Sequence, residues 1–219
     1  MKIYHGSKFV IEKPEYHGSD ERNDYGPSFY TTLSLDAAKI WACKNDTLGV
    51  VNEYEISDKI FKKLKVLDLT DKSKYSVLNW IAILMHFRKL DSRFEAQNKS
   101  ILMWLQKYYI DVNEYDVVVG FRADDAYFRF PVHFINSSLS IEDLEKVFLT
   151  GSLEVQYAFM SKNAVKSLKY KKTIECENEY LGVYFKTVSE LTKNINELAN
   201  QERNPNKTYI LDLMRKDHE

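Results

Sequence analysis

The sequence is poor in cysteine and lacks any long hydrophobic run. Cys43 and Cys176 are the only cysteines. Because they are few and far apart, they exclude a disulfide framework and a thiolate metal site, so we expect free thiols in a reducing compartment and no bound metal. No apolar run approaches the ~18 residues that indicate a membrane span, and the N-terminus has no signal-peptide pattern. We therefore expect a soluble, cytoplasmic protein without a membrane partner.

Charge of one sign is not in excess either. The chain carries 31 basic and 32 acidic residues, a net charge of −1, which gives no global case for binding nucleic acid or membranes. Two short basic runs, 62–65 and 169–172, are interpreted as solvated faces. The 5 histidines lack metal-ligand spacing. The chain also has no Gly-x-Ser-x-Gly elbow, no His-Glu-x-x-His and no Gly-x-x-x-x-Gly-Lys loop, which disfavours the chemistry of those motifs.

Hydrophobic and aromatic residues are what the chain has in quantity. They make up 44% and 14% of it, which suffices for a substantial core and argues against disorder. With 219 residues and no internal repeat, we predict a single domain over residues 1–219. Apolar patterning predicts strands at 2–5, 28–32, 49–56, 66–69, 116–121 and 153–160.

Helical periodicity and capping residues predict the other elements. Ser34 is a typical N-cap for a helix over 35–44, and Ser140 with Asp143 forms a capping box. Further helices are predicted at 74–90, 96–109, 140–148, 161–168 and 188–202, with a last helix ending near Arg215. The helical insertion at about 74–109 and the C-terminal helical extension at about 188–216 are interpreted as additions to a compact β core.

Three aromatic or heterocyclic side chains near the N-terminus are the first candidates for chemistry. Taken alone, His5 after a short strand is more often structural, and Tyr30 and Trp41 are more often core residues. Their order carries more information. A strand ends in Tyr-His-Gly-Ser at 4–7, and a polar loop at 9–26 leads to a Phe-Tyr strand and then to the helix that carries Trp41.

This order resembles the ADP-ribosyltransferase superfamily, in its branch of poly-ADP-ribose polymerases and diphtheria-type toxins. Those enzymes open with a strand ending in His-Gly, continue with a Gly-x-Tyr-Phe-like strand and a helix, and place a catalytic glutamate on a late strand. The counterparts here are residues 4–7, 24–32, 35–42 and 154–157. The sequence of these stretches is most similar to that of a bacterial group of small transferase-like proteins, which are often found in toxin–antitoxin or defence contexts. Members of this group also share the Ala-Asp-Asp stretch at 123–125.

The resemblance covers about 1–56 and 116–168, and it implies both a fold and a substrate. The implied fold is α+β: a split, curved, mixed β-sheet with an NAD⁺ cleft between its two halves. NAD⁺ is the implied substrate. His5 would bind the adenosine ribose with Ser7 assisting, and Gly6 would let the main chain approach the carboxamide. Tyr30 and Trp41 would sandwich the nicotinamide ring, a stacking worth ~1–3 kcal/mol.

Two further roles follow from the same resemblance. Arg22, in the loop at 9–26, is expected to pair with the pyrophosphate. The reaction cleaves an N-glycosidic bond through an oxocarbenium-like transition state, which a glutamate of the active enzymes stabilises. Gln156 best matches that glutamate, keeping its hydrogen-bonding shape without its charge, beside Tyr30 in the catalytic set. Glu154, two residues earlier on the same strand face, ranks second.

The Ala-Asp-Asp stretch supplies the third candidate for the catalytic polar group. Asp124 and Asp125 follow a buried strand and a glycine, and Asp125 is ranked after Gln156 and Glu154. An ordinary turn held by Asx-type backbone hydrogen bonds is an equally good interpretation of this pair.

We therefore expect an NAD-dependent mono-ADP-ribosyltransferase, a pentosyltransferase, acting as a toxin or phage-defence effector on protein or nucleic acid. If the toxin interpretation holds, a cognate antitoxin is the expected partner. Two alternatives stay open. The chain is a catalytically degenerate protein that binds NAD or ADP-ribose as an interaction module, favoured by Gln156 and by Ser28 in place of the usual glycine. Or it is a binding protein that kept only the fold, with 74–109 as its partner surface.

Overall fold

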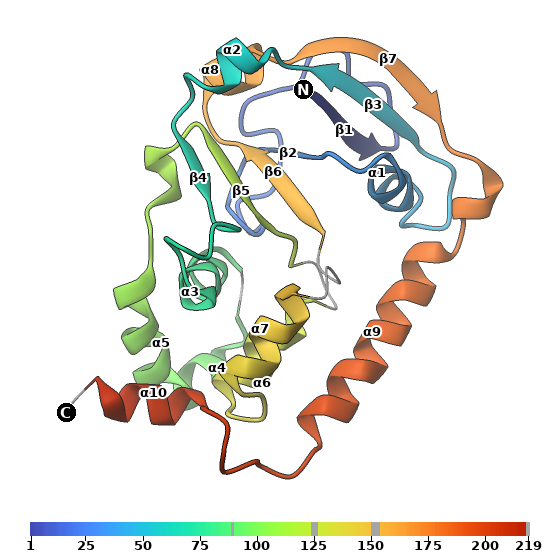
Figure 1. Cartoon of the computed structure of the whole chain (residues 1–219). Coiled ribbons are helices and arrows are strands. Elements are labelled where there is room, and N and C mark those ends of the chain that lie inside the picture. Colours follow the sequence, from blue (N-terminus) through green and yellow to red (C-terminus); the bar gives the residue numbers. More distant parts are fainter. Residues whose placement is uncertain (89, 124–126, 150–153, 218–219) are drawn as a thin grey trace.

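The computed structural model describes residues 1–88, 90–123, 127–149 and 154–217 (Figure 1). These residues form one mixed, seven-stranded sheet in the order β4-β5-β6-β2-β1-β3-β7, with helices packed around it. Only the pair β4–β5 is parallel among the described neighbours. The α+β class is thereby confirmed. The strands are β1 (Lys2–Ser7), β2 (Phe29–Thr32), β3 (Val50–Glu55), β4 (Val66–Asp68), β5 (Val117–Phe121), β6 (Val155–Phe159) and β7 (Lys169–Glu175).

The helices gather mainly at the β4–β5 end of the sheet and below it (Figure 1). None that the structure describes is long and apolar enough to cross a bilayer. The helices are α1 (Leu35–Ala42), α2 (Asp58–Phe61), α3 (Val77–Phe87), α4 (Ser92–Gln97), α5 (Lys99–Leu105), α6 (Arg129–Ile135), α7 (Ile141–Leu149), α8 (Lys162–Lys166), α9 (Val183–Ala199) and α10 (Ile210–Lys216). Short 3-10 turns are η1 (Gln106–Tyr108), η2 (Val112–Glu114) and η3 (Asn178–Tyr180).

The largest core lies between the sheet and α3. Helix α3 is apolar on nearly every side, and its Trp80, Ile81 and Leu84 are fully buried, as expected for a helix surrounded by protein. The same cluster takes in Val118 of β5 and Ile210 of α10. The segment 74–109 is therefore central to the fold instead of an addition to a finished β core.

A second core covers the opposite face of the sheet, where α2 and α8 lie side by side at one end (Figure 1). Strand β5 alternates between the two cores, because Val117 and Val119 face this second cluster while Val118 faces the first. This period of two is the ordinary consequence of a β-strand buried on both faces. It fixes which side chains of the neighbouring strand β6 can reach the pocket described below.

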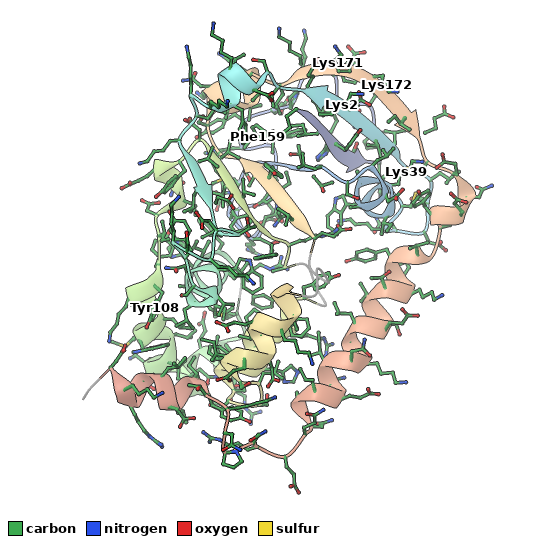
Figure 2. All side chains as sticks on the ribbon, viewed as in Figure 1. Lys2, Lys39, Tyr108, Phe159, Lys171 and Lys172 are labelled. Carbon is green, nitrogen blue, oxygen red and sulfur yellow. The ribbon has the colours of Figure 1, made fainter. Side chains whose placement is uncertain are left out.

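Several elements differ from their predicted form. The helix predicted at 96–109 is divided at Asn98, which ends α4 and begins α5. Helix α6 was not predicted; its Pro131 lies in the first turn, where the missing N–H costs little. The basic run at 169–172 forms part of edge strand β7, paired with β3. Its lysines are exposed, as edge-strand charges usually are, and Figure 2 shows Lys171 and Lys172 on this strand.

The two halves of the sheet meet at a short junction between β1 and β2. These strands are in register at one position, Tyr4 opposite Thr32, whereas β1 pairs with β3 along its whole length. Helix α1 begins here, because the Ser34 hydroxyl accepts a hydrogen bond from the backbone N–H of Ala37. This junction, with α1 over it, is where the main pocket opens.

Candidate functional site

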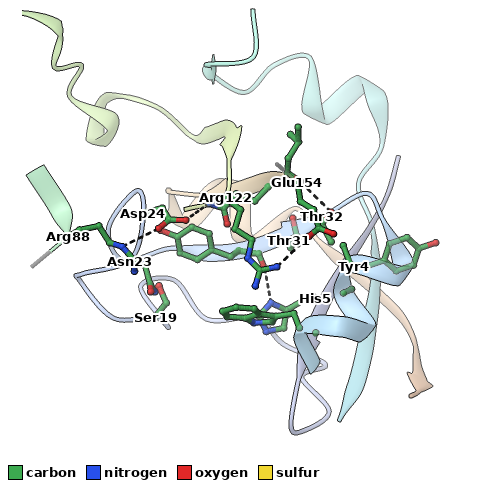
Figure 3. Close-up of a pocket in the computed structure, with 17 residues that line it drawn as sticks. Tyr4, His5, Ser19, Asn23, Asp24, Thr31, Thr32, Arg88, Arg122 and Glu154 are labelled. Atoms are coloured by element: carbon green, nitrogen blue, oxygen red, sulfur yellow. Dashed lines mark hydrogen bonds and ion pairs between the residues drawn. The ribbon is translucent and has the colours of Figure 1, made fainter. Parts of the chain in front are cut away.

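A pocket of about 220 Å³ opens where β1, β2 and the start of β6 meet α1. Figure 3 shows its walls, with Asp24 and Arg88 at one side and Glu154 at the other. The lining residues come from segments that are far apart in the sequence. They are Tyr4, His5, Gly6, Ser19, Asn23, Asp24, Tyr30, Thr31, Thr32, Ala37, Ala38, Trp41, Arg88, Arg122, Glu154, Val155 and Gln156.

Gly6 is required by the packing of α1 on β1. A Cβ placed on Gly6 would lie 2.0 Å from the carbonyl oxygen of Ala38 and 2.9 Å from the backbone nitrogen of Ala42. Both are backbone atoms of a helix and cannot rotate away. The glycine thus sets the distance between strand and helix, and that distance gives the pocket its depth.

His5 bridges the junction between β1 and β2. Its Nδ1 lies 2.6 Å from the carbonyl oxygen of Tyr30, so Nδ1 carries the proton and donates it. The ring also stacks on Phe29 at 4.5 Å. Burial lowers the pKa of His5, against the weaker opposite effect of that hydrogen bond. The neutral ring therefore leaves Nε2 as an acceptor, which suits a ligand hydroxyl.

Tyr30 forms the pocket wall with its ring and holds the neighbouring loop with its hydroxyl. The hydroxyl donates to the carbonyl oxygen of Gly26 at 2.7 Å and accepts from the backbone N–H of Tyr25 at 3.0 Å. Gly26 has a φ of +79°, which favours glycine at this turn. Burial, and then the charge of Asp24, raise the pKa of Tyr30, so its phenol stays protonated.

Trp41 lies at the mouth of the pocket in contact with two cations. The Arg122 guanidinium is 4.0 Å from the indole ring centre, and Lys44 Nζ is 3.7 Å from it. Tyr184 of α9 meets the same ring edge-on at 6.1 Å. An aromatic ligand can stack on Trp41 only where it replaces one of these cations, so a sandwich between Tyr30 and Trp41 requires Arg122 or Lys44 to move.

The half-buried Gln156 and the buried Asp24 form a polar pair in the wall of the site. Gln156 Nε2 donates to Asp24 Oδ2 at 2.8 Å, and the same oxygen accepts from the backbone N–H of Ala123 at 2.8 Å. Arg88 Nε lies 3.5 Å from Asp24 Oδ1. Asp24 is only 6% exposed, and its burial is tolerated because these donors and the Arg88 charge compensate it.

Glu154 stands at the rim of the same pocket. Its carboxylate lies 3.4 Å from Arg122 Nη1, and its side chain is 36% exposed. Gln156 lies in β6 and Glu154 comes directly before that strand, and both residues line the pocket. Gln156 lies opposite Gly120 of β5 and Thr32 of β2, and the side chain of Tyr25 fills the space over Gly120.

The structure brings together most of the residues that the sequence predicted. His5, Gly6, Tyr30, Trp41, Glu154 and Gln156 all line the pocket. Ser7 and Arg22 lie outside that lining. The Ser7 hydroxyl donates to the carbonyl oxygen of Phe9 and accepts from Asn52, and Arg22 is exposed on its loop. The candidates Asp124 and Asp125 fall outside the described residues.

Three charged residues of the pocket were not predicted. Asp24 begins the stretch 24–32, in which the aromatic residues carry the resemblance, and nothing in its local pattern indicates burial. Arg88 ends a helix that the sequence presented as an addition, so its approach to Asp24 depends on long-range packing. Arg122 could have been found, because a polar residue directly after a buried strand often lies at the edge of a site.

The comparisons with known proteins identify the family of the chain. The model of the family described as "Protein of unknown function (DUF3990)" matches residues 1–170, so the chain belongs to this family. No curated protein matches the chain, and no solved structure matches it either.

Proposed function

We propose that this member of the DUF3990 family is an NAD⁺-dependent mono-ADP-ribosyltransferase that binds the nicotinamide end of NAD⁺ in the pocket at the β1–β2 junction. The observation that carries the proposal is that the residues matching the transferase motifs lie together in space. These residues come from β1, β2, α1 and β6, and they line one pocket. The short β1–β2 pairing also fits the split sheet that the resemblance implies.

The size of the pocket supports a ring-sized ligand fragment. Its volume of about 220 Å³ lies below the ~300–1,000 Å³ of sites that enclose a whole drug-sized molecule. The nicotinamide ring and part of its ribose fit such a space, and the rest of the dinucleotide would then run over the rim. Arg122, at that rim, is better placed than Arg22 to pair with a phosphate.

The proposed reaction moves ADP-ribose from nicotinamide to an acceptor. The bond between ribose C1′ and the pyridinium nitrogen breaks, and its electron pair goes to the ring, which leaves as neutral nicotinamide. A bond forms between C1′ and the nucleophilic atom of the acceptor, whose proton passes to Glu154 at the rim. His5 Nε2 and the Gln156 carbonyl oxygen line the same pocket, so here both would accept hydrogen bonds from the nicotinamide ribose and hold it in line, whereas the resemblance assigns His5 to the adenosine ribose.

A second candidate function is binding of NAD⁺ or ADP-ribose without transfer. Gln156 favours it, because a neutral amide stabilises an oxocarbenium-like centre less than a carboxylate does. Its amide nitrogen is also occupied by Asp24. The acceptor class, an effector role in toxicity or defence, and a cognate antitoxin remain predictions from the resemblance.

Transfer of radiolabel from NAD⁺ tests the two candidates. The purified protein is incubated with labelled NAD⁺ and bacterial lysate, and samples are then treated with nuclease or protease. We expect label in one macromolecular fraction, lost in Gln156→Ala and retained in Gln106→Ala. Gln106 is an exposed glutamine of η1 away from the pocket, so it serves as the matched control.

Each other outcome of this experiment has a definite meaning. Binding of NAD⁺ without transferred label supports the binding protein over the transferase. Transfer that survives in Gln156→Ala removes Gln156 from the site while leaving the activity in place. Neither binding nor transfer by the wild-type protein rejects both functions.

A further inference from the structure

The pocket contains a buried carboxylate that no predicted role accounts for. Asp24 lies in the loop between β1 and β2, and its side chain is 8% exposed. Groups from distant parts of the chain converge on it, among them the N–H of Ala123, the amide of Gln156 and the guanidinium of Arg88. Burying a charge is costly unless it is paired. A loop that needed only anchoring could use a neutral side chain here.

The contact between Asp24 and Gln156 fixes the orientation of the glutamine amide. A carboxylate oxygen accepts hydrogen bonds, so the group 2.8 Å from it must be the NH₂ of Gln156. The carbonyl oxygen Oε1 is then the atom that Gln156 can offer to a ligand in the pocket. Without Asp24 the amide could turn over and present a donor instead.

We propose that Asp24 is the positioning residue of this site, which holds Gln156 with Oε1 as a hydrogen-bond acceptor for the nicotinamide ribose and adds the negative charge that Gln156 lacks. This inference rests on the proposed function. In the transferases that this chain resembles, one glutamate both accepts the ribose hydroxyl and carries the charge. Here the two tasks are divided between neighbouring side chains, the acceptor on β6 and the charge on the β1–β2 loop.

Arg88 compensates the buried negative charge of Asp24. Its Nε faces Asp24, and its Nη2 donates to the carbonyl oxygen of Ala123 at 2.6 Å. Asp24 and Arg88 therefore hold the end of β5, through Ala123, beside Gln156. Asp24 and Arg88 lie together at one side of the pocket, and both line it (Figure 3).

Exchange of the carboxylate and the amide tests the inference. Asp24→Asn keeps the shape but removes the charge and the fixed orientation. We expect kcat for NAD⁺ cleavage to fall on the order of 10²-fold, as misplaced reacting groups do, with the Kd for NAD⁺ changed by less than about threefold because the ring site stays intact.

Gln156→Glu places two carboxylates at hydrogen-bonding distance, so they must share a proton and the variant gains a new dependence of kcat on pH. The double variant Asp24→Asn/Gln156→Glu restores one carboxylate and one amide with their places exchanged. We expect its kcat to return to within about tenfold of the wild type, in line with the role of paired groups that act as one unit.

The outcomes separate this inference from the proposed function. A wild-type protein that does not bind NAD⁺ overturns both, and one that binds NAD⁺ without cleaving it overturns the transferase and with it the role of Asp24 in the reaction. An active wild type whose kcat is unchanged in Asp24→Asn overturns only the inference. If Asp24 merely anchors its loop, the single and double variants lose NAD⁺ affinity and thermal stability together and the exchange gives no rescue. That result also contradicts the positioning role.

Discussion

Substitution of Gly6 by alanine separates the packing role of this residue from its predicted role in ligand binding. The new Cβ would lie 2.0 Å from the carbonyl oxygen of Ala38. It must recede by about 1 Å to reach 3.0 Å, the shortest separation that real Cβ atoms show. Because the obstructing atoms belong to the backbone of α1, the whole helix has to move, and the pocket between α1 and β1 must change with it.

The cost of this movement can be estimated from overpacked cores. Inserting a methyl group into a close-packed site costs about 1–3 kcal/mol, and a backbone-on-backbone clash belongs at the upper end. For a chain of this size, each kcal/mol lowers Tm by about 2–4 °C, so Gly6→Ala should lower Tm by about 4–12 °C. The loss should occur without any ligand.

Thermal and urea unfolding of Gly6→Ala, beside Gly18→Ala, measure this effect. Gly18 lies in the loop before β2, has no positive φ, and its Cβ would meet nothing closer than 3.3 Å. We expect the control to change the free energy of unfolding by less than about 0.5 kcal/mol. A Gly6→Ala protein as stable as the control, with only NAD⁺ binding lost, would refute the packing argument and favour the ligand-contact role.

Two further predictions concern titratable groups. Burial lowers the pKa of His5 below its ordinary 6.5, so the unfolded chain takes up the proton first as pH falls. In urea unfolding, the contribution of His5 to the free energy of unfolding should therefore be fully present above pH 6.5 and decline below it. His5→Gln should remove this contribution to the pH dependence. Burial, and then the contact with Cys43, raise the pKa of Cys176 to about 12. Both thiols should resist a disulfide reagent at pH 8 until urea unfolds the protein; rapid labelling of the native protein would contradict their burial.

Local patterns predicted much of the sheet correctly. The strand at 2–5, the strand at 28–32 and the helix at 35–44 exist with boundaries within two residues of those predicted. Their signals are short-range: a cap at Ser34 and runs of apolar or β-branched residues. Strand β7 was missed because its lysines conceal the period of two, and only its pairing with β3 reveals it.

The residues of the site that belong to sequence motifs could be predicted. His5, Gly6 and Tyr30 stand in a recognisable order, so the sequence placed them together before the structure did. The charges of the pocket follow a different logic. Asp24 and Arg88 are 64 positions apart in the sequence and meet only because α3 packs against the sheet. No periodicity or spacing in one sequence encodes such a contact.

Calorimetric titration of the purified protein with NAD⁺ tests the central claim most directly. The comparison is between the wild type, His5→Ala and His133→Ala. His133 is a histidine of α6 whose pKa is also lowered by burial but which lies outside the pocket. The account predicts saturable binding of NAD⁺ to the wild type and to His133→Ala, with binding lost or strongly weakened in a folded His5→Ala. Absence of binding to the wild type, or equal binding by all three proteins, would contradict the NAD⁺ pocket at the β1–β2 junction.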